Sequence, residues 1–261
     1  MPKQKNYQTK MKQTLITMTL LSAITAGASA ATLGVNSATA ASWNDGDNTN
    51  TSGTPFGNWS LVANPGQEGF AGFFTGDSKD LDTGSGADIN SPSTSFGMFG
   101  NQGGNADAFL VLSSALSVGQ SLSFDLGVNF RNGNKGVDIR DGSDTVIFNF
   151  NIGTDDHVVN NATTGNGSTG NAYSANTAFN LSFTQTSVGG GNWTINRSGG
   201  TTDSDSGTYT GAVASLKLYN GADGGGAANN LFANSFTVVP EPSSAALLGL
   251  AGLALILRRR K

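Results

Sequence analysis

The chain has 261 residues, of which 37 are glycine, 12% are charged and 8% are aromatic. Fifteen Phe, three Trp and four Tyr can bury a core, which excludes a fully disordered chain, and six Pro without a three-residue glycine period exclude collagen. The absence of cysteine excludes disulfides, thiolate metal sites and a cysteine nucleophile.

Charge divides the chain into three regions. Residues 1–30 contain four lysines and no acid, and residues 258–261 are all basic. Residues 31–239 carry six basic residues against seventeen acidic ones, an excess of eleven negative charges. Such acidity disfavours a nucleic-acid partner, whose phosphates would be repelled, and favours an extracellular protein that can bind cations.

Residues 1–30 have the pattern of a secretory signal peptide. Lysines precede the apolar run 15–26, and Ala28-Ser29-Ala30 forms a small-residue cleavage pattern. A second such pattern at 38–40 would place the cut as late as 40–41. As a helix the apolar run is about 18 Å long, too short for a stable membrane crossing. The sequence therefore predicts export.

From residue 42 onward, apolar and polar residues alternate in short segments. The ranges 59–62, 70–74 and 109–112 are the first predicted strands. Residues 120–130 alternate strictly, which predicts a strand with one buried and one solvated face. The residues of its predicted buried face are Leu122, Phe124, Leu126, Val128 and Phe130.

Two more strands are predicted directly after residue 130. They span 137–140 and 146–152, and in the second Val146, Phe148, Phe150 and Ile152 form the predicted buried face. An Asn-Gly pair at 132–133 and an Asp-Gly pair at 141–142 separate the segments, and both pairs are hairpin signals. The three segments together predict an antiparallel meander.

Strands at 179–183, 193–195, 216–218 and 232–238 complete the prediction. Ten to twelve short strands without helical periodicity or a fixed repeat predict an all-β domain over residues 42–238, an antiparallel β-sandwich or jelly roll. This strand pattern resembles concanavalin-like lectins and carbohydrate-binding modules; a helix is expected at each end of the chain. Loops are predicted at 44–57, 76–106, 160–177, 198–206 and 220–230.

Residues suited to catalysis are scarce. Glycosidases use a pair of carboxylates, commonly including a Glu acid, but Glu68 and Glu241 are the only glutamates. His157 is the only histidine, and it follows two aspartates in a predicted loop. We therefore predict a protein that is not an enzyme.

Calcium is the only cofactor that the sequence suggests. Asp45 and Asp47, and likewise Asp203 and Asp205, place two carboxylates at i and i+2 in predicted loops, where their oxygens can converge on a cation. Solvated aspartates in turns are the alternative.

Three tryptophans are candidates for sugar contacts. Trp43, Trp59 and Trp193 have aromatic faces on which a sugar ring can stack. Trp59 and Trp193 lie in predicted strands, so packing in the core is the alternative interpretation.

Residues 239–261 form a separate module. Pro240-Glu241-Pro242 is followed by an apolar run at 245–257 and by Arg258, Arg259, Arg260 and Lys261. Thirteen apolar residues span about 20 Å as a helix, short of a ~30 Å hydrocarbon core. The basic end is expected to stay in the cytoplasm, which makes this segment a transient membrane anchor.

These three parts, in this order, resemble the PEP-CTERM sorting signal of Gram-negative, exopolysaccharide-producing bacteria. The resemblance implies recognition of Pro240-Glu241-Pro242 by an exosortase, a membrane protease-transpeptidase that removes the tail. It implies an inner-membrane intermediate and then a place at the cell surface, the outer membrane or the extracellular matrix. A permanent tail anchor is the alternative.

Two classes of function remain open from the sequence. The first is a non-enzymatic surface or matrix protein associated with exopolysaccharide in a biofilm. The second is a secreted polysaccharide-active enzyme on a lectin-like sandwich. An adhesin or ice-binding protein is a further alternative, for which regular Thr ladders, not found in the sequence, would be the sign.

Overall fold

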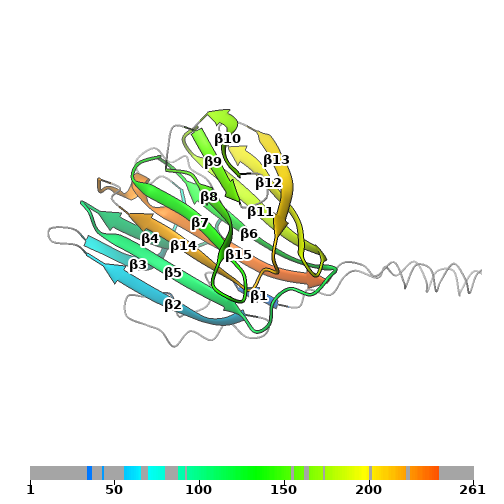
Figure 1. Cartoon of the computed structure of the whole chain (residues 1–261). Helices are drawn as coiled ribbons and strands as arrows, with labels where there is room; N and C mark the ends of the chain where they lie inside the picture. Colours follow the sequence, from blue (N-terminus) through cyan, green and yellow to red (C-terminus); the bar gives the residue numbers. More distant parts are fainter. Residues whose placement is uncertain are drawn as a thin grey trace, which may run out of the picture. The chain divides into compact units, whose positions relative to one another are not determined.

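Two layers of antiparallel strands make up the fold (Figure 1). The computed structural model describes part of the chain, and the described part contains fifteen strands and one 3-10 turn, η1 (Ala227–Asn229). The described residues are 34–36, 43, 56–65, 70–79, 88–91, 93–153, 156–161, 165–172, 174–199, 202–221 and 224–240. They belong to one folding unit, Thr32–Pro240.

One layer is an eight-stranded sheet with the order β13-β12-β11-β6-β15-β4-β3, in which β1 pairs with β15. Its strands are β1 (Gly34–Asn36), β3 (Phe70–Gly76), β4 (Ser95–Asn101), β6 (Gln120–Val128), β11 (Thr177–Ser187), β12 (Gly190–Gly199), β13 (Asp203–Thr210) and β15 (Leu231–Pro240).

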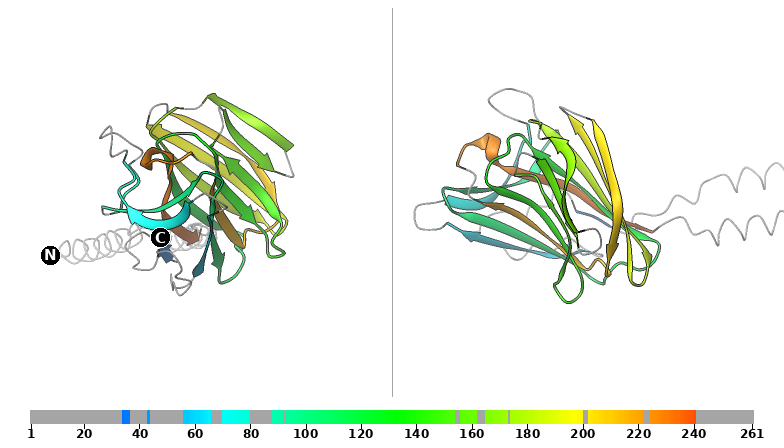
Figure 2. Two further views of the ribbon diagram at one scale, coloured as in Figure 1. Left: turned by 90° about the vertical axis from the view of Figure 1, so that its left-hand side faces the viewer. Right: turned by 45° about the horizontal axis from the view of Figure 1, so that its top comes forward.

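The other layer is a seven-stranded sheet with the order β10-β9-β8-β7-β14-β5-β2. Its strands are β2 (Phe56–Asn64), β5 (Asn105–Leu112), β7 (Asn134–Arg140), β8 (Val146–Asn151), β9 (Asp156–Asn161), β10 (Gly165–Ala172) and β14 (Ser215–Gly221). Figure 2 shows the two layers from two further sides.

Aromatic side chains fill the space between the layers. Phe124 of β6 stacks on Phe183 and Phe236 within the eight-stranded sheet, with ring centroids 6.2 and 5.2 Å apart. Phe148 of β8 crosses the gap between the sheets, with its ring centroid 5.0 Å from that of Phe183. These contacts confirm the predicted antiparallel sandwich with one core.

The predicted meander is wrong for its first pair of strands, which do not pair with each other. β6 pairs with β11 and β15 in one sheet, whereas β7 pairs with β8 and β14 in the other. Only β7 and β8 are neighbours, so the residues between Val128 and Asn134 carry the chain from one layer to the other. A turn signal predicts a change of direction but cannot tell a hairpin from a crossing between sheets.

Two residues that the alternation predicts to be buried, Phe130 and Val146, are exposed. Phe130 lies beyond the end of β6 and is 46% exposed, and the buried neighbour is Asn129, whose Nδ2 donates to the Ser78 carbonyl. In β8, a register irregularity opposite Arg140 exposes Val146 and buries Ile147. A bulge adds one residue to one strand and so shifts the alternation by one.

Several predicted loops are partly strands. β9 and β10 pair through much of 160–177, β13 begins inside 198–206, and β4 lies inside 76–106. The sequences of β10 and β13 are rich in Gly, Asn, Ser and Thr and give little apolar alternation. The helix expected at each end of the chain lies outside the described residues. In the described part of the chain, no helix has the length and apolar character needed to cross a membrane.

β15 occupies a central place in the eight-stranded sheet. One of its edges pairs with β6 along its length, and the other pairs with β4 as far as Ala233 and with β1 from Phe236 to Val238. Its last residue is Pro240, the first proline of the predicted sorting signal, whose Cα partner is Gln120. The sheet thus extends beyond both predicted bounds of the domain, residues 42 and 238.

Candidate functional site: a polar sheet face

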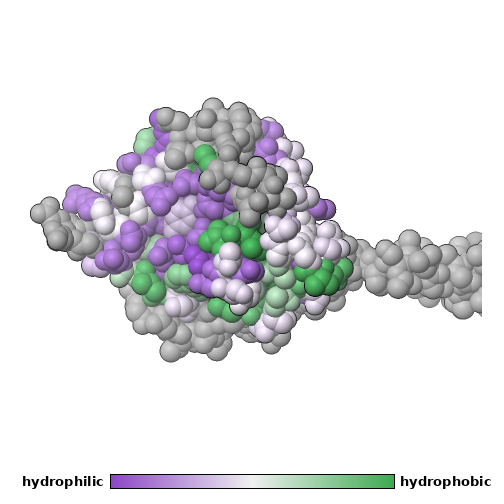
Figure 3. Space-filling view, viewed as in Figure 1, coloured by the Kyte–Doolittle hydropathy of each residue, from purple (hydrophilic) through white to green (hydrophobic). Residues whose placement is uncertain are grey.

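The outward face of the seven-stranded sheet carries a connected set of polar side chains. Core residues such as Leu218, Ile139 and Phe148 point inward from these strands, so the residues between them point outward. Figure 3 shows hydrophilic residues gathered over the region of β7, β8 and β14. We call this the polar face; its members are Asp107, Asn134, Asp138, Arg140, Asn149, Asn151, Asn160, Lys217 and Tyr219.

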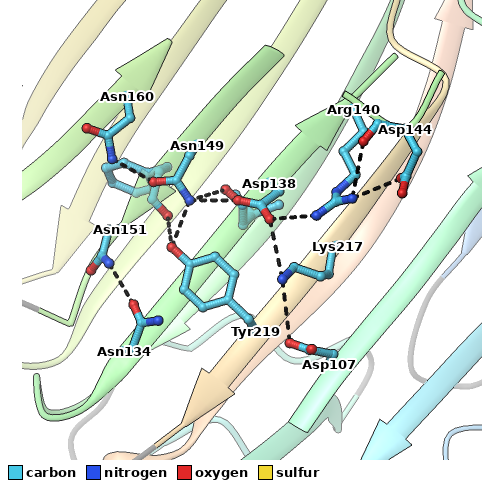
Figure 4. Close-up of polar contacts among 12 residues, drawn as sticks. Asp107, Asn134, Asp138, Arg140, Asp144, Asn149, Asn151, Asn160, Lys217 and Tyr219 are labelled. Carbon is cyan, nitrogen blue, oxygen red and sulfur yellow. Dashed lines mark hydrogen bonds and ion pairs between the residues drawn. The ribbon is translucent and has the colours of Figure 1, made fainter. Parts of the chain in front are cut away.

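Asp138 of β7 is the hub of the polar face (Figure 4). Its Oδ1 accepts a hydrogen bond of 2.8 Å from Asn149 Nδ2. Its Oδ2 accepts one of 3.3 Å from Arg140 Nη2 and lies 3.5 Å from Lys217 Nζ. Both carboxylate oxygens are therefore engaged by neighbouring strands. Hydrogen bonds to a charged group are among the stronger ones.

The network continues along the sheet from its two cations. Lys217 Nζ also lies 3.8 Å from Asp107 Oδ1, and Arg140 Nη1 donates to Asp144 Oδ1 at 2.9 Å. Burial acts to lower the pKa of Arg140, but its hydrogen bonds to Asp144 and Asp138 outweigh burial and raise that pKa. The guanidinium is thus held charged against two carboxylates.

Tyr219 lies against the sheet because its neighbour is a glycine. A Cβ at Gly136 would stand 2.7 Å from the Tyr219 hydroxyl and 2.0 Å from the Phe150 carbonyl oxygen. Asn149 Nδ2 donates to this hydroxyl at 2.9 Å, and Lys217 Nζ lies 5.4 Å from the ring centroid. Burial raises the pKa of Tyr219, so the phenol is neutral at physiological pH.

Asparagine amides extend the polar face toward β9. Asn160 Nδ2 donates to Asn149 Oδ1, and Asn151 Nδ2 donates to Asn134 Oδ1, both at 2.8 Å. Each amide presents donors and an acceptor in an orientation fixed by these bonds. Such an arrangement can hydrogen-bond to the hydroxyl groups of a sugar.

The outward face of the eight-stranded sheet is polar in a different way. Rows of Ser, Thr and Asn run across β13, β12, β11 and β6. The rows are Ser204-Asn196-Asn180-Asp125, Ser206-Thr194-Ser182-Ser123 and Thr208-Asn192-Thr184-Ser121. We call this the hydroxyl-amide face. Its rows mix Ser, Thr, Asn and Asp and are not a regular Thr ladder.

The three tryptophans lie in the core. Trp43, Trp59 and Trp193 are 1%, 2% and 6% exposed. Trp43 Nε1 donates to the Gly97 carbonyl at 2.9 Å, and its ring centroid lies 4.6 Å from that of Trp59. Buried rings present no face to a sugar, so the hypothesis of stacking platforms is wrong for these residues and the packing alternative holds.

The described residues contain no cluster of metal ligands that would support the calcium hypothesis. Asp203 and Asp205 lie in β13, opposite Arg197 and Ile195 of β12, and not in a loop. Asp45 and Asp47 lie outside the described residues, where calcium stays a prediction. Within the described part of the chain, no three residues of the types His, Cys, Asp and Glu come together as metal ligands.

The structure places His157 in β9, and several other residues singled out from the sequence lie outside the described residues. His157 is in a strand, not in the predicted loop, and its side chain is outside the description. The signal-peptide residues Ala28 and Ala30, the glutamates Glu68 and Glu241, Pro242 and the basic run 258–261 lie outside the described residues.

Comparison with known proteins gives one sequence match. Residues 238–261 match the family model described as the PEP-CTERM protein-sorting motif. The chain therefore carries this motif, as the sequence predicts, and the motif implies export and processing by an exosortase. No curated protein matches the chain.

Solved structures give distant likenesses. The receptor-binding domain of botulinum neurotoxin mosaic serotype C/D is 12% identical, with a TM-score of 0.40 over 80% of this chain and 47% of that one. The receptor-binding domain of botulinum neurotoxin type G is 9% identical, with a TM-score of 0.39 over 77% of this chain and 48% of that one. The galectin LEC-6 of Caenorhabditis elegans is 16% identical, with a TM-score of 0.35 over 54% of this chain and 94% of that one. The chain matches about half the length of the neurotoxin domains, and at these scores the likenesses carry no argument.

Proposed function

We propose that this chain is an exported protein, sorted by an exosortase to the cell surface or matrix, whose sandwich binds extracellular polysaccharide without catalysing a reaction. The match of residues 238–261 to the sorting motif carries the proposal. It begins within β15, so the folded domain is joined directly to the signal. In a host strain without the exosortase, the protein should keep Arg258 to Lys261, and in the parent strain it should lose them. A protein that keeps this basic run in both strains would contradict the proposed sorting.

The polar face supports the binding part of the proposal. Asn160, Asn134 and Asp107 lie at its margins, with polar atoms that the network leaves available. At the centre, Asp138 is bound by two cations and an amide. A carboxylate engaged in this way is poorly placed to act as a nucleophile or a general acid, which favours binding over hydrolysis.

Retention on immobilised exopolysaccharide from the native host tests the binding site. A double variant, Asn160→Ala with Asp107→Asn, should bind at least tenfold more weakly. The matched control, Asn196→Ala with Thr194→Ala, changes the hydroxyl-amide face and should bind as the wild type does. Melting curves should show that both variants are folded. Weaker binding by the control variant alone would place the binding site on the hydroxyl-amide face instead.

A reducing-sugar assay on the same polysaccharide tests the absence of catalysis. The wild-type protein should release no sugar ends above background. Release that Asp138→Asn abolishes would contradict the proposal and would support the polysaccharide-active enzyme.

A further inference from the structure

We propose that the polar face binds an uncharged polysaccharide, whose sugar rings lie against an apolar border formed by Val62 of β2 and by Phe109 and Val111 of β5. This inference rests on the proposed binding of polysaccharide, and it adds which class of chain is bound and which class is excluded. Two features of the surface carry it, the residues along the border and the state of the charges beside them.

The apolar border lies directly beside the polar network. Antiparallel pairing places Val62 opposite Asp107 and Phe109 opposite Lys217. Directly opposed residues project from the same side of a sheet, so these apolar side chains share the outward face with the network. Val62 and Val111 are 50% and 52% exposed, and Phe109 is half-buried. Apolar surface thus adjoins fixed hydrogen-bonding groups on this face (Figure 3).

Phe109 is held against the network by a cation. Arg140 Cζ lies 6.0 Å from the Phe109 ring centroid, and the same guanidinium is bonded to Asp138 and Asp144. A ring that is already held in place loses little rotamer freedom when a ligand packs on it. Phe109 therefore offers a preorganised apolar contact in the middle of the border.

A pyranose ring matches such a boundary. Its C–H groups form an apolar face, and its hydroxyl groups project around the edge as donors and acceptors. A ring against Phe109 has its edge beside Asp107, the next outward residue of β5, and beside Ser60, which is exposed opposite Phe109 on β2. A purely apolar ligand would bury this carboxylate without replacing its water, which is costly. Sugar hydroxyls replace that water.

The cations of the polar face are already neutralised. Lys217 Nζ lies 3.5 Å from Asp138 Oδ2 and 3.8 Å from Asp107 Oδ1, and the lysine side chain is 20% exposed. The Arg140 side chain is 15% exposed and is bound by Asp138 and Asp144. An anionic sugar would therefore have to displace a carboxylate to reach either cation.

The charges of this network that are most open to solvent are negative. The Asp144 side chain is 74% exposed and that of Asp107 is 31% exposed. Three carboxylates face two cations in the network, and residues 31–239 carry an excess of eleven negative charges. A polyuronate or a sulfated chain would be repelled within the Debye length, about 10 Å at 0.1 M salt. The face therefore selects an uncharged chain.

Anion exchange of the native host's exopolysaccharide into neutral and acidic fractions provides the ligands for the test. The protein purified from that host, in EDTA to remove bridging divalent cations, should be retained on the immobilised neutral fraction and not on the acidic one. Preferential retention on the acidic fraction would overturn the inference and leave polysaccharide binding intact. Failure to bind either fraction would overturn the proposed binding, and the inference falls with it.

Two controls show whether charge sets the preference. Reduction of the carboxyl groups of the acidic fraction to alcohols keeps its backbone and should raise its retention; no gain would contradict exclusion by charge. Retention on the neutral fraction should stay constant between about 0.05 and 0.5 M salt, because the ligand forms no ion pair. A loss of retention at high salt would contradict an uncharged ligand.

A pair of exposed valines tests the apolar border. Val62→Ser should weaken binding to the neutral fraction roughly three- to tenfold, because it removes apolar contact with the sugar. The matched control is Val188→Ser, 88% exposed in the turn between β11 and β12, and it should bind as the wild type does. Phe109→Ala should weaken binding at least as much as Val62→Ser, with melting curves showing that each variant is folded. Wild-type binding by both border variants would overturn the assigned contact.

Discussion

Phe124 and Phe70 illustrate how two phenylalanines in strands of the same sheet can differ in importance. Phe124 is fully buried in β6, with ring contacts to Phe183 and Phe236, whereas Phe70 is 69% exposed at the start of β3. Burial, not residue type, therefore determines what each side chain contributes to stability.

We expect Phe124→Ala to lower the free energy of unfolding by about 3–5 kcal/mol, the usual cost of removing a buried phenylalanine and leaving a cavity. The control, Phe70→Ala, should change it by no more than about 0.5 kcal/mol. Urea unfolding followed by tryptophan fluorescence measures both. Equal effects of the two substitutions would contradict the assigned core.

Sequence reasoning identified the sorting signal but missed the polar face. Pro240-Glu241-Pro242, the apolar run and the basic run follow one another within residues 240–261, so they can be recognised without knowing the fold. The residues of the polar face come from five strands, β5, β7, β8, β9 and β14, and their contacts depend on sheet order. The available signal was a single polar residue between two apolar ones, as at Lys217, which predicts an outward side chain but not its neighbours.

The packing of a β12 side chain against β13 cannot be predicted from the sequence of either strand alone. Trp193 of β12 lies directly opposite Gly207 of β13. A Cβ at Gly207 would stand 2.7 Å from the indole ring, so the glycine makes room for it. An aromatic ring over a cross-strand glycine is a recurrent way to stabilise a sheet.

Gly207→Val should lower the free energy of unfolding by about 1–3 kcal/mol, because the new side chain displaces the Trp193 ring. The matched control is Ser206→Val, one position earlier on the exposed face of the same strand. Valine favours strands, so this control should be neutral or slightly stabilising. Thermal melting compares the two; a loss of stability in both would indicate that the edge strand tolerates no change.

The sequence predicted most strands of the sandwich, but it predicted few of the strands with which each one pairs. Alternation located β6 and β8 because their apolar residues are large. It missed β10, whose sequence GNGSTGNA contains no large apolar residue. It also could not assign β6 and β7 to different sheets, because that choice depends on β11 and β15, which lie far along the chain.

Two buried tyrosines connect the stability of the whole domain to pH. The Tyr209 hydroxyl donates to Gln185 Oε1 at 3.2 Å, and the Tyr219 hydroxyl lies in the polar face. Burial raises the pKa of both phenols above the ordinary value of 10.0. Above pH 10 the unfolded chain therefore releases protons that the folded chain keeps.

The free energy of unfolding should consequently be constant with respect to these groups below pH 10 and fall as the pH rises further. The slope should reach at most about 1.4 kcal/mol per pH unit for each tyrosine. Urea midpoints at pH 8, 9.5, 10.5 and 11 measure it. In the double variant Tyr209→Phe with Tyr219→Phe the slope should flatten; an unchanged slope would assign the alkaline loss to other groups.

The position of β15 also has a consequence for the order of assembly. The last strand of the described residues separates β4 from β6, and its partners Met98 and Leu126 precede it by more than a hundred residues. Pairings so distant in sequence form slowly. In an exported chain the eight-stranded sheet cannot close until residue 240 has left the translocation channel, and until then β4 and β6 keep open edges. Completion of folding thus reports that the sorting signal has reached the membrane.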